Sequence, residues 1–355
     1  MTRVLFNLGS GCFSKLLGCV LLMFSGMLMA AASATAQTFA SFAAEGSQAL
    51  AAGNLDAALT SFRRAAKIDP ANPQIQFNLG LTLVRMGKLS QAIAPLKSAA
   101  REPSLAAEAH FLLGASYFEV RQYANAIAEL KQLQAPAQPE RVLYMLEESN
   151  RVLGRAAEAQ DAFRKLNRQY PDSAWTHFLL ATAYENQQQW DIAITEYQNA
   201  LKADSTIPNA NFAIGYIFWR ERNFDAAREW LQKEAAHGCH ALANLYLGEI
   251  AQRNQDVPSA ENRYRTALRC DASLADAHSR LGVLLASQKR YQEAIVQLKE
   301  AIRLEPANSS SHYHLGSVYR AMGRKAEANA EYAKVRQLQA AADASGSPGS
   351  GESRP

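Results

Sequence analysis

One alanine returns at nearly constant spacing along this chain, and no other feature constrains the fold as much. Nine copies are separated by 33 or 34 residues: Ala58, Ala92, Ala126, Ala159, Ala193, Ala227, Ala260, Ala294 and Ala328. A second series, mostly glycine, keeps step twelve residues earlier: Gly46, Gly80, Gly114, Glu147, Ala181, Gly215, Gly248, Gly282 and Gly316. Two series in step indicate a repeat array, in which each unit contacts mainly its neighbours.

Each repeat reads as two helices joined by a short turn. In residues 174–207, apolar side chains recur at helical spacing on both sides of a polar turn at residues 187–189. We expect an antiparallel helix pair, in which the small residues of the two series let the backbones approach closely. A glycine inside a helix costs about 1 kcal/mol relative to alanine, so its repeated use indicates close packing. Gly53, Gly87, Gly154 and Gly323 mark the expected turns.

The residues around the two series resemble the tetratricopeptide repeat. Leu113-Gly114 with Tyr117 matches the first helix of that family, and Ala193 with Tyr197 matches the second. The resemblance implies an all-α, right-handed α-solenoid of antiparallel helix pairs over residues 39–342. The expected units lie near 39–72, 73–106, 107–139, 140–173, 174–207, 208–240, 241–274, 275–308 and 309–342.

One unit departs from the pattern. It carries Glu147 in place of glycine and Asn150 in place of the aromatic residue, and the preceding unit has Pro136 and Pro139 near its end. Proline interrupts helices, so we hypothesise a looser joint around residues 133–142. Hydrogen exchange tests this: protection there equal to that of neighbouring segments would contradict it.

The first 36 residues form a separate segment. Arg3 and Lys15 precede an uncharged apolar run from Leu16 to Ala32, and Ala34-Thr35-Ala36 follows as a small-x-small site. This order is typical of a secretory signal peptide cleaved after Ala36. The alternatives are an uncleaved membrane anchor and lipidation at Cys19, although most of the apolar run follows Cys19. Residues 343–355 are rich in Gly, Ser and Pro and predict a disordered tail.

Composition and charge narrow the partner classes. The full chain has 20% charged residues and a net charge of +4, which becomes +2 when Arg3 and Lys15 are removed. No basic block stands out, so we expect neither nucleic acid nor an anionic membrane surface as partner. The expected location is outside the cytoplasm: the periplasm or envelope, or the secreted fraction.

After cleavage only two cysteines remain, Cys239 and Cys270. They fall at the same end of an antiparallel helix pair, and an exported protein meets oxidising conditions, so we predict a disulfide. The alternatives are two separate buried thiols, or a zinc site completed by His237 and His240. Four further histidines occupy one shared repeat position, and we interpret them as packing residues: His110, His177, His278 and His312.

We find no spacing typical of a catalytic, phosphate-binding or haem site, and predict no catalytic residue, cofactor or metal.

The family's geometry implies that first helices line a concave groove. The aromatic residues at those positions are Phe77, Phe111, Phe118, Trp175, Phe178, Phe212, Tyr216, Trp219 and Tyr313. Such a groove suits an extended peptide or partner helix. The predicted function is a non-catalytic exported scaffold that binds protein or peptide. The alternatives are a subunit of an envelope or secretion assembly using its convex face or ends, and, remotely, an enzyme.

Overall fold

The protein is described here as a computed structural model, which covers residues 37–344; these form helices joined by short turns. The expected signal peptide lies outside the described residues, as does the tail from residue 345 onward. The last helix continues to Ala344, two residues beyond the predicted end of the array, because alanine favours helix and the first glycine comes only at Gly346. Within the described range, no helix is both long and apolar enough to span a membrane.

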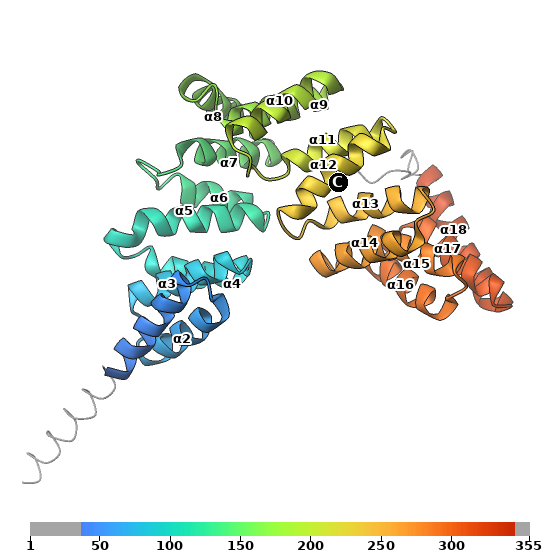
Figure 1. The fold of residues 1–355 in the computed structure, drawn as a ribbon, viewed down its shortest axis with the longest axis horizontal. Helices are drawn as coiled ribbons and strands as arrows, with labels where there is room; N and C mark the ends of the chain where they lie inside the picture. Colours follow the sequence, from blue (N-terminus) through green and yellow to red (C-terminus); the bar gives the residue numbers. More distant parts are fainter. Residues whose placement is uncertain (1–36, 345–355) are drawn as a thin grey trace, which may run out of the picture. The chain divides into compact units, whose positions relative to one another are not determined.

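The helices group into two compact units that meet in sequence at Pro171 and Asp172 (Figure 1). Unit 1 contains a helix over residues 37–51, followed by α2 (Leu55–Ile68), α3 (Pro73–Arg85), α4 (Leu89–Ala99), α5 (Pro103–Glu119), α6 (Tyr123–Leu130), α7 (Pro139–Val152) and α8 (Ala156–Gln169). Unit 2 contains α9 (Ala174–Asn186), α10 (Trp190–Ala203), α11 (Ala210–Arg220), α12 (Phe224–Ala236), α13 (Ala241–Arg253), α14 (Val257–Cys270), α15 (Ala275–Ser287), α16 (Tyr291–Leu304), α17 (Ser309–Ala321) and α18 (Lys325–Ala344).

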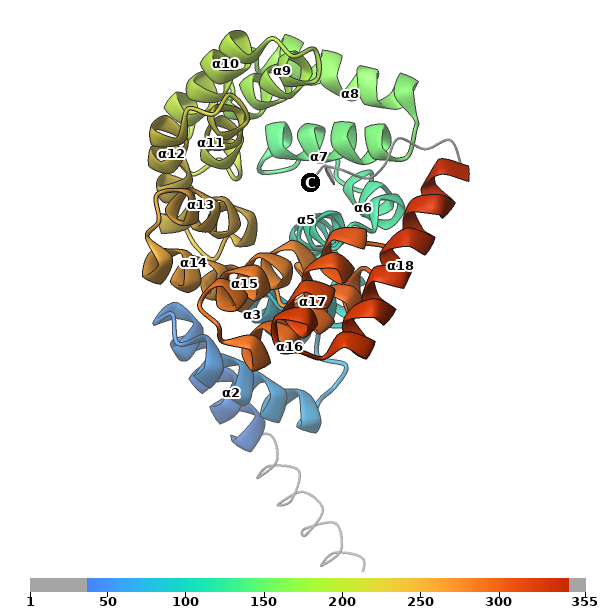
Figure 2. The same cartoon turned by 90° about the vertical axis from the view of Figure 1, so that its right-hand side faces the viewer.

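Within each unit, every helix packs against the next along the chain, and the strongest contacts join the two helices of one pair. In unit 2, α11 and α13 lie on the inner side of the arc that the unit makes, and their partners α12 and α14 lie on its outer side (Figure 2). The prediction of an all-α solenoid of antiparallel helix pairs is confirmed.

The glycine series explains the tightness of each pair. A Cβ added at Gly80 would lie 2.6 Å from the side chain of Leu96, and one added at Gly248 would lie 2.6 Å from the ring of Tyr264. Contacts this short leave no room for a larger residue. The first helix therefore lies directly on a large buried side chain of the second, sixteen residues later.

The turns inside the pairs repeat one backbone conformation. Gly53 and Gly323 have φ values of 73° and 75°, in the left-handed region. At the equivalent place in other repeats stand non-glycine residues with φ between 60° and 64°: Arg121, Gln188, Arg222, Gln255 and Lys289. A left-handed residue after the last helical turn is a common helix ending, and glycine adopts it with least strain.

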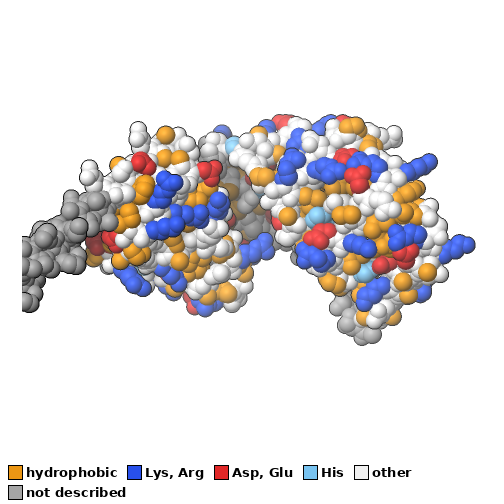
Figure 3. All heavy atoms as spheres, turned by 90° about the horizontal axis from the view of Figure 1, so that it is seen from below, with side chains coloured by type: hydrophobic (Ala, Val, Ile, Leu, Met, Phe, Trp, Pro, Cys, Tyr) orange, Lys and Arg blue, Asp and Glu red, His pale blue; other side chains and the backbone are white. Residues whose placement is uncertain are grey.

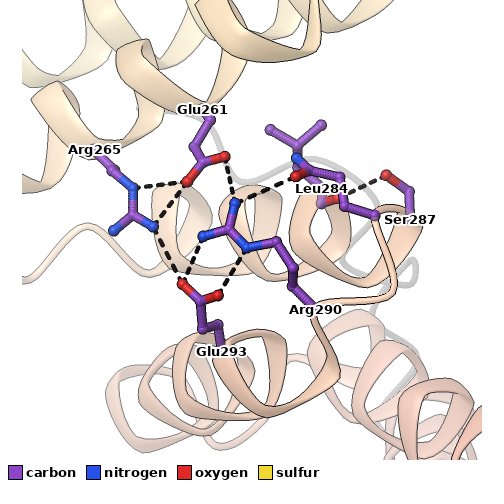
Figure 4. Close-up of polar contacts among 7 residues, drawn as sticks. Glu261, Arg265, Leu284, Ser287, Arg290 and Glu293 are labelled. Atoms are coloured by element: carbon purple, nitrogen blue, oxygen red, sulfur yellow. Dashed lines mark hydrogen bonds and ion pairs between the residues drawn. The ribbon is translucent and has the colours of Figure 1, made fainter.

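A network of ion pairs connects the outer helices of two successive repeats in unit 2 (Figure 4). Arg290, just before α16, donates to Glu261 of α14 at 2.7 Å and to Glu293 of α16 at 2.6 and 2.7 Å. Arg265 donates to the opposite oxygen of Glu261 at 2.8 Å. Because these side chains are partly exposed, the network contributes little to stability.

Candidate functional site

The inner face of unit 2 carries four touching aromatic rings. Helical geometry brings residues i, i+4 and i+7 to one side, so Phe212, Tyr216 and Trp219 of α11 share this face. Tyr246 of α13 completes what we call the aromatic cluster. Ring centroids are 4.7 Å apart for Trp219 and Tyr246, 5.3 Å for Tyr216 and Tyr246, and 6.0 Å for Tyr216 and Trp219.

These separations are those of favourable aromatic pairs. Tyr246 is buried, with 9% of its surface exposed, and the three rings of α11 are half-buried around it. The cluster therefore leaves aromatic surface accessible while its members hold one another in place. Tyr246 was absent from the predicted groove because it lies one helical position away from the expected inner-face register. The neighbouring aromatic residues of α11 were the only signal for it in the sequence.

The loop between α12 and α13 supports the cluster from one side. His240 stacks on Phe212 with ring centroids 4.8 Å apart, and its Nδ1 accepts the N–H of Ala243 at 3.0 Å, which caps α13. Burial lowers the pKa of His240, so the neutral ring is favoured. The preceding residue, Cys239, is joined to Cys270 at the end of α14 by a disulfide, with Cα atoms 5.3 Å apart. Both sulfurs are thereby occupied, and neither serves as a thiolate ligand for zinc.

Charged side chains border the aromatic cluster on α13 and α15. Glu249 pairs with Arg280 at 2.8 Å, and the exposed fractions of these two side chains are 14% and 56%. Burial raises the pKa of Glu249; Arg280 opposes this, and Asp276 adds to it. Burial also raises the pKa of Tyr246, with further contributions from Tyr216, Glu249 and Asp276. Both carboxylates thus act electrostatically on the cluster.

The remaining predicted groove residues of unit 2 lie on α9 and α17. Trp175 and Phe178 of α9 are half-buried against the core of this part of unit 2, and the ring of Phe178 meets that of Tyr197 at 5.3 Å. Tyr313 of α17 is 51% exposed and lies 5.8 Å from the ring of Tyr332.

Unit 1 has a smaller aromatic group. Phe118 of α5 meets Tyr144 of α7 at 5.8 Å, and the guanidinium of Arg141 lies 5.7 Å from the ring centre of Phe111. Phe77 differs, because only 5% of its surface is exposed and it packs in the core of the first repeats. It offers no surface to a partner, and its prediction as a groove residue is corrected here.

Two hollows open on unit 2. One of about 220 Å³ lies between α15, α16 and α17 and is lined by Val283, Ala286, Tyr291, Leu298, His314, Ser317, Val318 and Ala321. The other, of about 260 Å³, lies between α10, α11 and α12 and is lined by Gln198, Leu201, Ser205, Asn211, Trp230, Lys233 and His237. On the face drawn in Figure 3, basic side chains of each unit are interspersed with acidic and apolar ones.

The four repeated histidines connect the two helices of their pairs. Each places Nδ1 within 2.6 to 2.7 Å of a side-chain oxygen nineteen residues later: His110 with Glu129, His177 with Glu196, His278 with Gln297, and His312 with Glu331. This regular partnership accounts for the histidines within the fold. Among the described residues, no three His, Cys, Asp or Glu side chains gather as a metal site would require.

Several curated proteins resemble this chain. It is 23% identical over 292 residues to the BBSome complex member BBS4 homolog of Drosophila melanogaster, covering 78% of this chain and 53% of that protein. It is 31% identical over 147 residues to the type IV pilus assembly protein PilF of Pseudomonas aeruginosa, covering 40% of this chain and 58% of PilF. The chain thus spans between half and three-fifths of the length of these two relatives.

Solved structures show the same fold. The hetero-tetramer Cut9–Hcn1 of the APC/C aligns with a TM-score of 0.58 at 17% identity, over 80% of this chain and 56% of the other. The PilF structure from Pseudomonas aeruginosa aligns with a TM-score of 0.51 at 17% identity, over 57% of this chain and 92% of PilF.

Sequence patterns of the tetratricopeptide repeat match most of the array. One matches residues 77–141, 178–238 and 245–298, and others match 46–87, 142–173, 284–323 and 309–341. Repeats of this kind form scaffolds for interaction with other proteins. With its helix pairs, glycine series and left-handed turns, the chain belongs to the tetratricopeptide repeat family.

Proposed function

We propose that this chain is a non-catalytic scaffold that captures an extended protein or peptide segment on the inner face of unit 2. The observation that supports this most is the aromatic cluster of Phe212, Tyr216, Trp219 and Tyr246. The three half-buried rings of α11, held by one another and by the buried Tyr246, lose little conformational freedom on binding, and Trp and Tyr are the side chains enriched at binding hot spots.

Site-specific photo-crosslinking tests this proposal. A photoreactive phenylalanine analogue at Tyr216 should label the partner, whereas the same analogue at Trp230, in the hollow between α10, α11 and α12, should not. Trp219→Ala should remove an anchor worth about 2 to 4 kcal/mol and abolish the label at Tyr216. Labelling from Trp230 alone would move the binding site to the outer face.

The alternative function is that of a structural subunit of an envelope assembly, which would use the outer face of the array. The hollow of about 260 Å³ between α10, α11 and α12 includes the ring of Trp230. PilF, which is named as a pilus assembly protein, resembles 40% of this chain. In that case Trp230→Ala, and not Trp219→Ala, would release the chain from its assembly.

We also propose that the protein is exported to the periplasm or envelope. The apolar N-terminal run and its small-residue site support export, and the Cys239–Cys270 disulfide suits an oxidising compartment. Cell fractionation, with mass spectrometry of the mature N-terminus, tests this: a first residue other than Gln37 would contradict cleavage after Ala36.

A further inference from the structure

Asn211 of α11 is the exception to a pairing that recurs along the array. Each of the four repeated histidines contacts a polar side chain nineteen residues later, on the second helix of its pair. In the next repeat Asn244 occupies the same position, and its side-chain oxygen accepts a hydrogen bond from Arg263, again nineteen residues later, at 3.0 Å. The residue nineteen positions after Asn211 is Trp230. An indole has one donor and no acceptor, so it cannot replace the polar partner.

The carboxamide of Asn211 is buried without a hydrogen bond. Only 5% of the residue is exposed. Asn244 also donates to the carbonyl oxygen of His240 at 2.9 Å, whereas within residues 37–344 the side chain of Asn211 bonds to neither backbone nor side chain. A carboxamide offers two donor hydrogens and a carbonyl acceptor. Since an unpaired buried polar group is costly, this side chain calls for a partner.

A hollow opens at this side chain. Asn211 lines the space of about 260 Å³ between α10, α11 and α12. The half-buried side chains of Leu201 and Trp230 supply the apolar part of its lining. Gln198 and Ser205 add neutral polar groups that are exposed at its edge. The unpaired carboxamide therefore borders a space whose walls are mainly aromatic and aliphatic.

The charged groups around this hollow favour a neutral ligand. The ammonium of Lys233 lies 2.8 Å from the carboxylate of Glu229 and 3.9 Å from the ring centre of Trp230. This ion pair is largely exposed, so water screens it. His237, the other basic side chain of the lining, is exposed at the edge, and the described lining contains no Asp or Glu. The nearby carboxylate of Glu234 accepts a backbone N–H of α11 at 3.1 Å.

We propose that the hollow at Asn211 binds a small neutral ligand that carries a carboxamide on a short apolar chain. The ligand's carboxamide pairs with that of Asn211, since each group offers a donor and an acceptor in one plane. The apolar chain packs on Leu201 and Trp230. Sites for drug-sized ligands measure about 300 to 1,000 Å³, so this ligand is smaller: a free amide, or the side chain of a glutamine. The site uses no residue of the aromatic cluster and goes beyond the proposed function.

Fluorine NMR of the mature chain, labelled with fluorotryptophan, tests the proposal. The chain has four tryptophans, and Trp230→Phe assigns the signal of Trp230. The probe is isocaproamide; its methyl ketone and isocaproate have the same shape but lack the amide donors. We expect isocaproamide to shift the Trp230 signal, to leave the Trp219 signal unchanged, and to bind about tenfold more tightly than the ketone. A blocked Ala-Gln-Ala peptide ending in an N-methylamide distinguishes the two sources: binding as tight as that of isocaproamide identifies a glutamine side chain, and weaker binding identifies a free amide.

Three variants locate the effect. Asn211→Leu, which is similar in size, should remove the preference for the amide without lowering the urea midpoint of unit 2, because it removes an unpaired polar group. Asn244→Leu is the matched change in the next repeat: it should lower the midpoint, because two hydrogen bonds are lost, and keep the preference. Trp230→Arg supplies the kind of partner that Asn244 has in Arg263. It should abolish binding of isocaproamide, which is measured in this variant on the proton signals of the ligand.

Several outcomes would overturn the inference. Equal binding of the amide and the ketone would show that Asn211 recognises nothing in the ligand. Tighter binding of isocaproate would identify Lys233 as the group that is recognised. A midpoint lowered by Asn211→Leu as much as by Asn244→Leu would show that the Asn211 carboxamide is satisfied within the fold. A Trp230 signal that no probe shifts would also overturn the inference, and it would leave the inner-face function standing.

Discussion

Replacing Glu147 by alanine should stabilise unit 1. Glycine occupies the equivalent position in α3 and α5, where an added Cβ would lie 2.6 Å from Leu96 and 2.5 Å from Leu130. In α7 a glutamate must fit in the same place, opposite Phe163. The side chain of Phe163 is half-buried, whereas Leu96 and Leu130 are buried at 0% and 1% exposure. One carboxylate oxygen of Glu147 is buried without a hydrogen-bond partner.

The size of the expected stabilisation follows from the pKa of Glu147. Burial raises the pKa of Glu147 from 4.5 to about 7; Glu148 adds to this, and Arg151 opposes it. At about 1.36 kcal/mol per pKa unit, this shift corresponds to about 3 kcal/mol of unfolding free energy. Screening by water at this partly buried site reduces it to about 1 to 2 kcal/mol. The pKa of Glu147 is higher in the folded state than in the unfolded chain. The contribution of this group to the stability of unit 1 is therefore fully present below about pH 4.5 and is lost as pH rises through about 7.

Glu147→Ala should therefore stabilise unit 1 by about 1 to 2 kcal/mol near pH 8 and by much less near pH 5. Hydrogen exchange of α7 and α8 measures this, and exchange near pH 8 should slow by about tenfold. All four tryptophans lie in unit 2, at residues 175, 190, 219 and 230, so their fluorescence in urea serves as an internal control that should not change. Glu158→Ala, which removes an exposed carboxylate of α8, is the matched variant. Destabilisation by Glu147→Ala at both pH values would refute the reasoning.

Three further predictions concern unit 2 and use tryptophan fluorescence in urea. Cys239→Ser should lower stability by about 3 to 4 kcal/mol, because the disulfide to Cys270 closes a loop with a sequence separation of 31; a reductant should reproduce this loss in the native chain and have no effect on the variant. A double-mutant cycle between His312 and Glu331, whose Nδ1 and Oε2 lie 2.7 Å apart, should show a coupling of about 1 kcal/mol, and zero coupling would contradict a stabilising contact. Gly248→Leu should cost about 3 kcal/mol, because even a Cβ there meets Tyr264 at 2.6 Å; an unchanged midpoint would mean that the helices of this pair can separate freely.

The sequence predicted those parts of the fold that repeat. Gly248 and Tyr264 occupy repeat positions where seven of the nine units have glycine followed by a large side chain sixteen residues later, so their packing could be inferred without coordinates. The partnership of His177 with Glu196 is equally regular, yet it depends on a contact between two helices that apolar periodicity does not report. The grouping of the helices into two units was also not predicted, because no composition change marks Pro171.

The candidate site was harder to predict because it arises where the repeats differ. Register alone placed Phe77 and Trp219 on the same face, yet Phe77 is buried by its neighbours and Trp219 lies in an aromatic cluster. Whether a ring at a given position is core or surface depends on the size of the side chains around it, and these vary from repeat to repeat. Tyr246 illustrates this: its position is one step off the expected register, and contact with Tyr216 brings it into the cluster. The same reasoning applies to Glu147, where one changed side chain turns a regular helix contact into a pH-sensitive one. In a solenoid the repeated residues determine the fold, so binding specificity has to come from the residues that break the pattern.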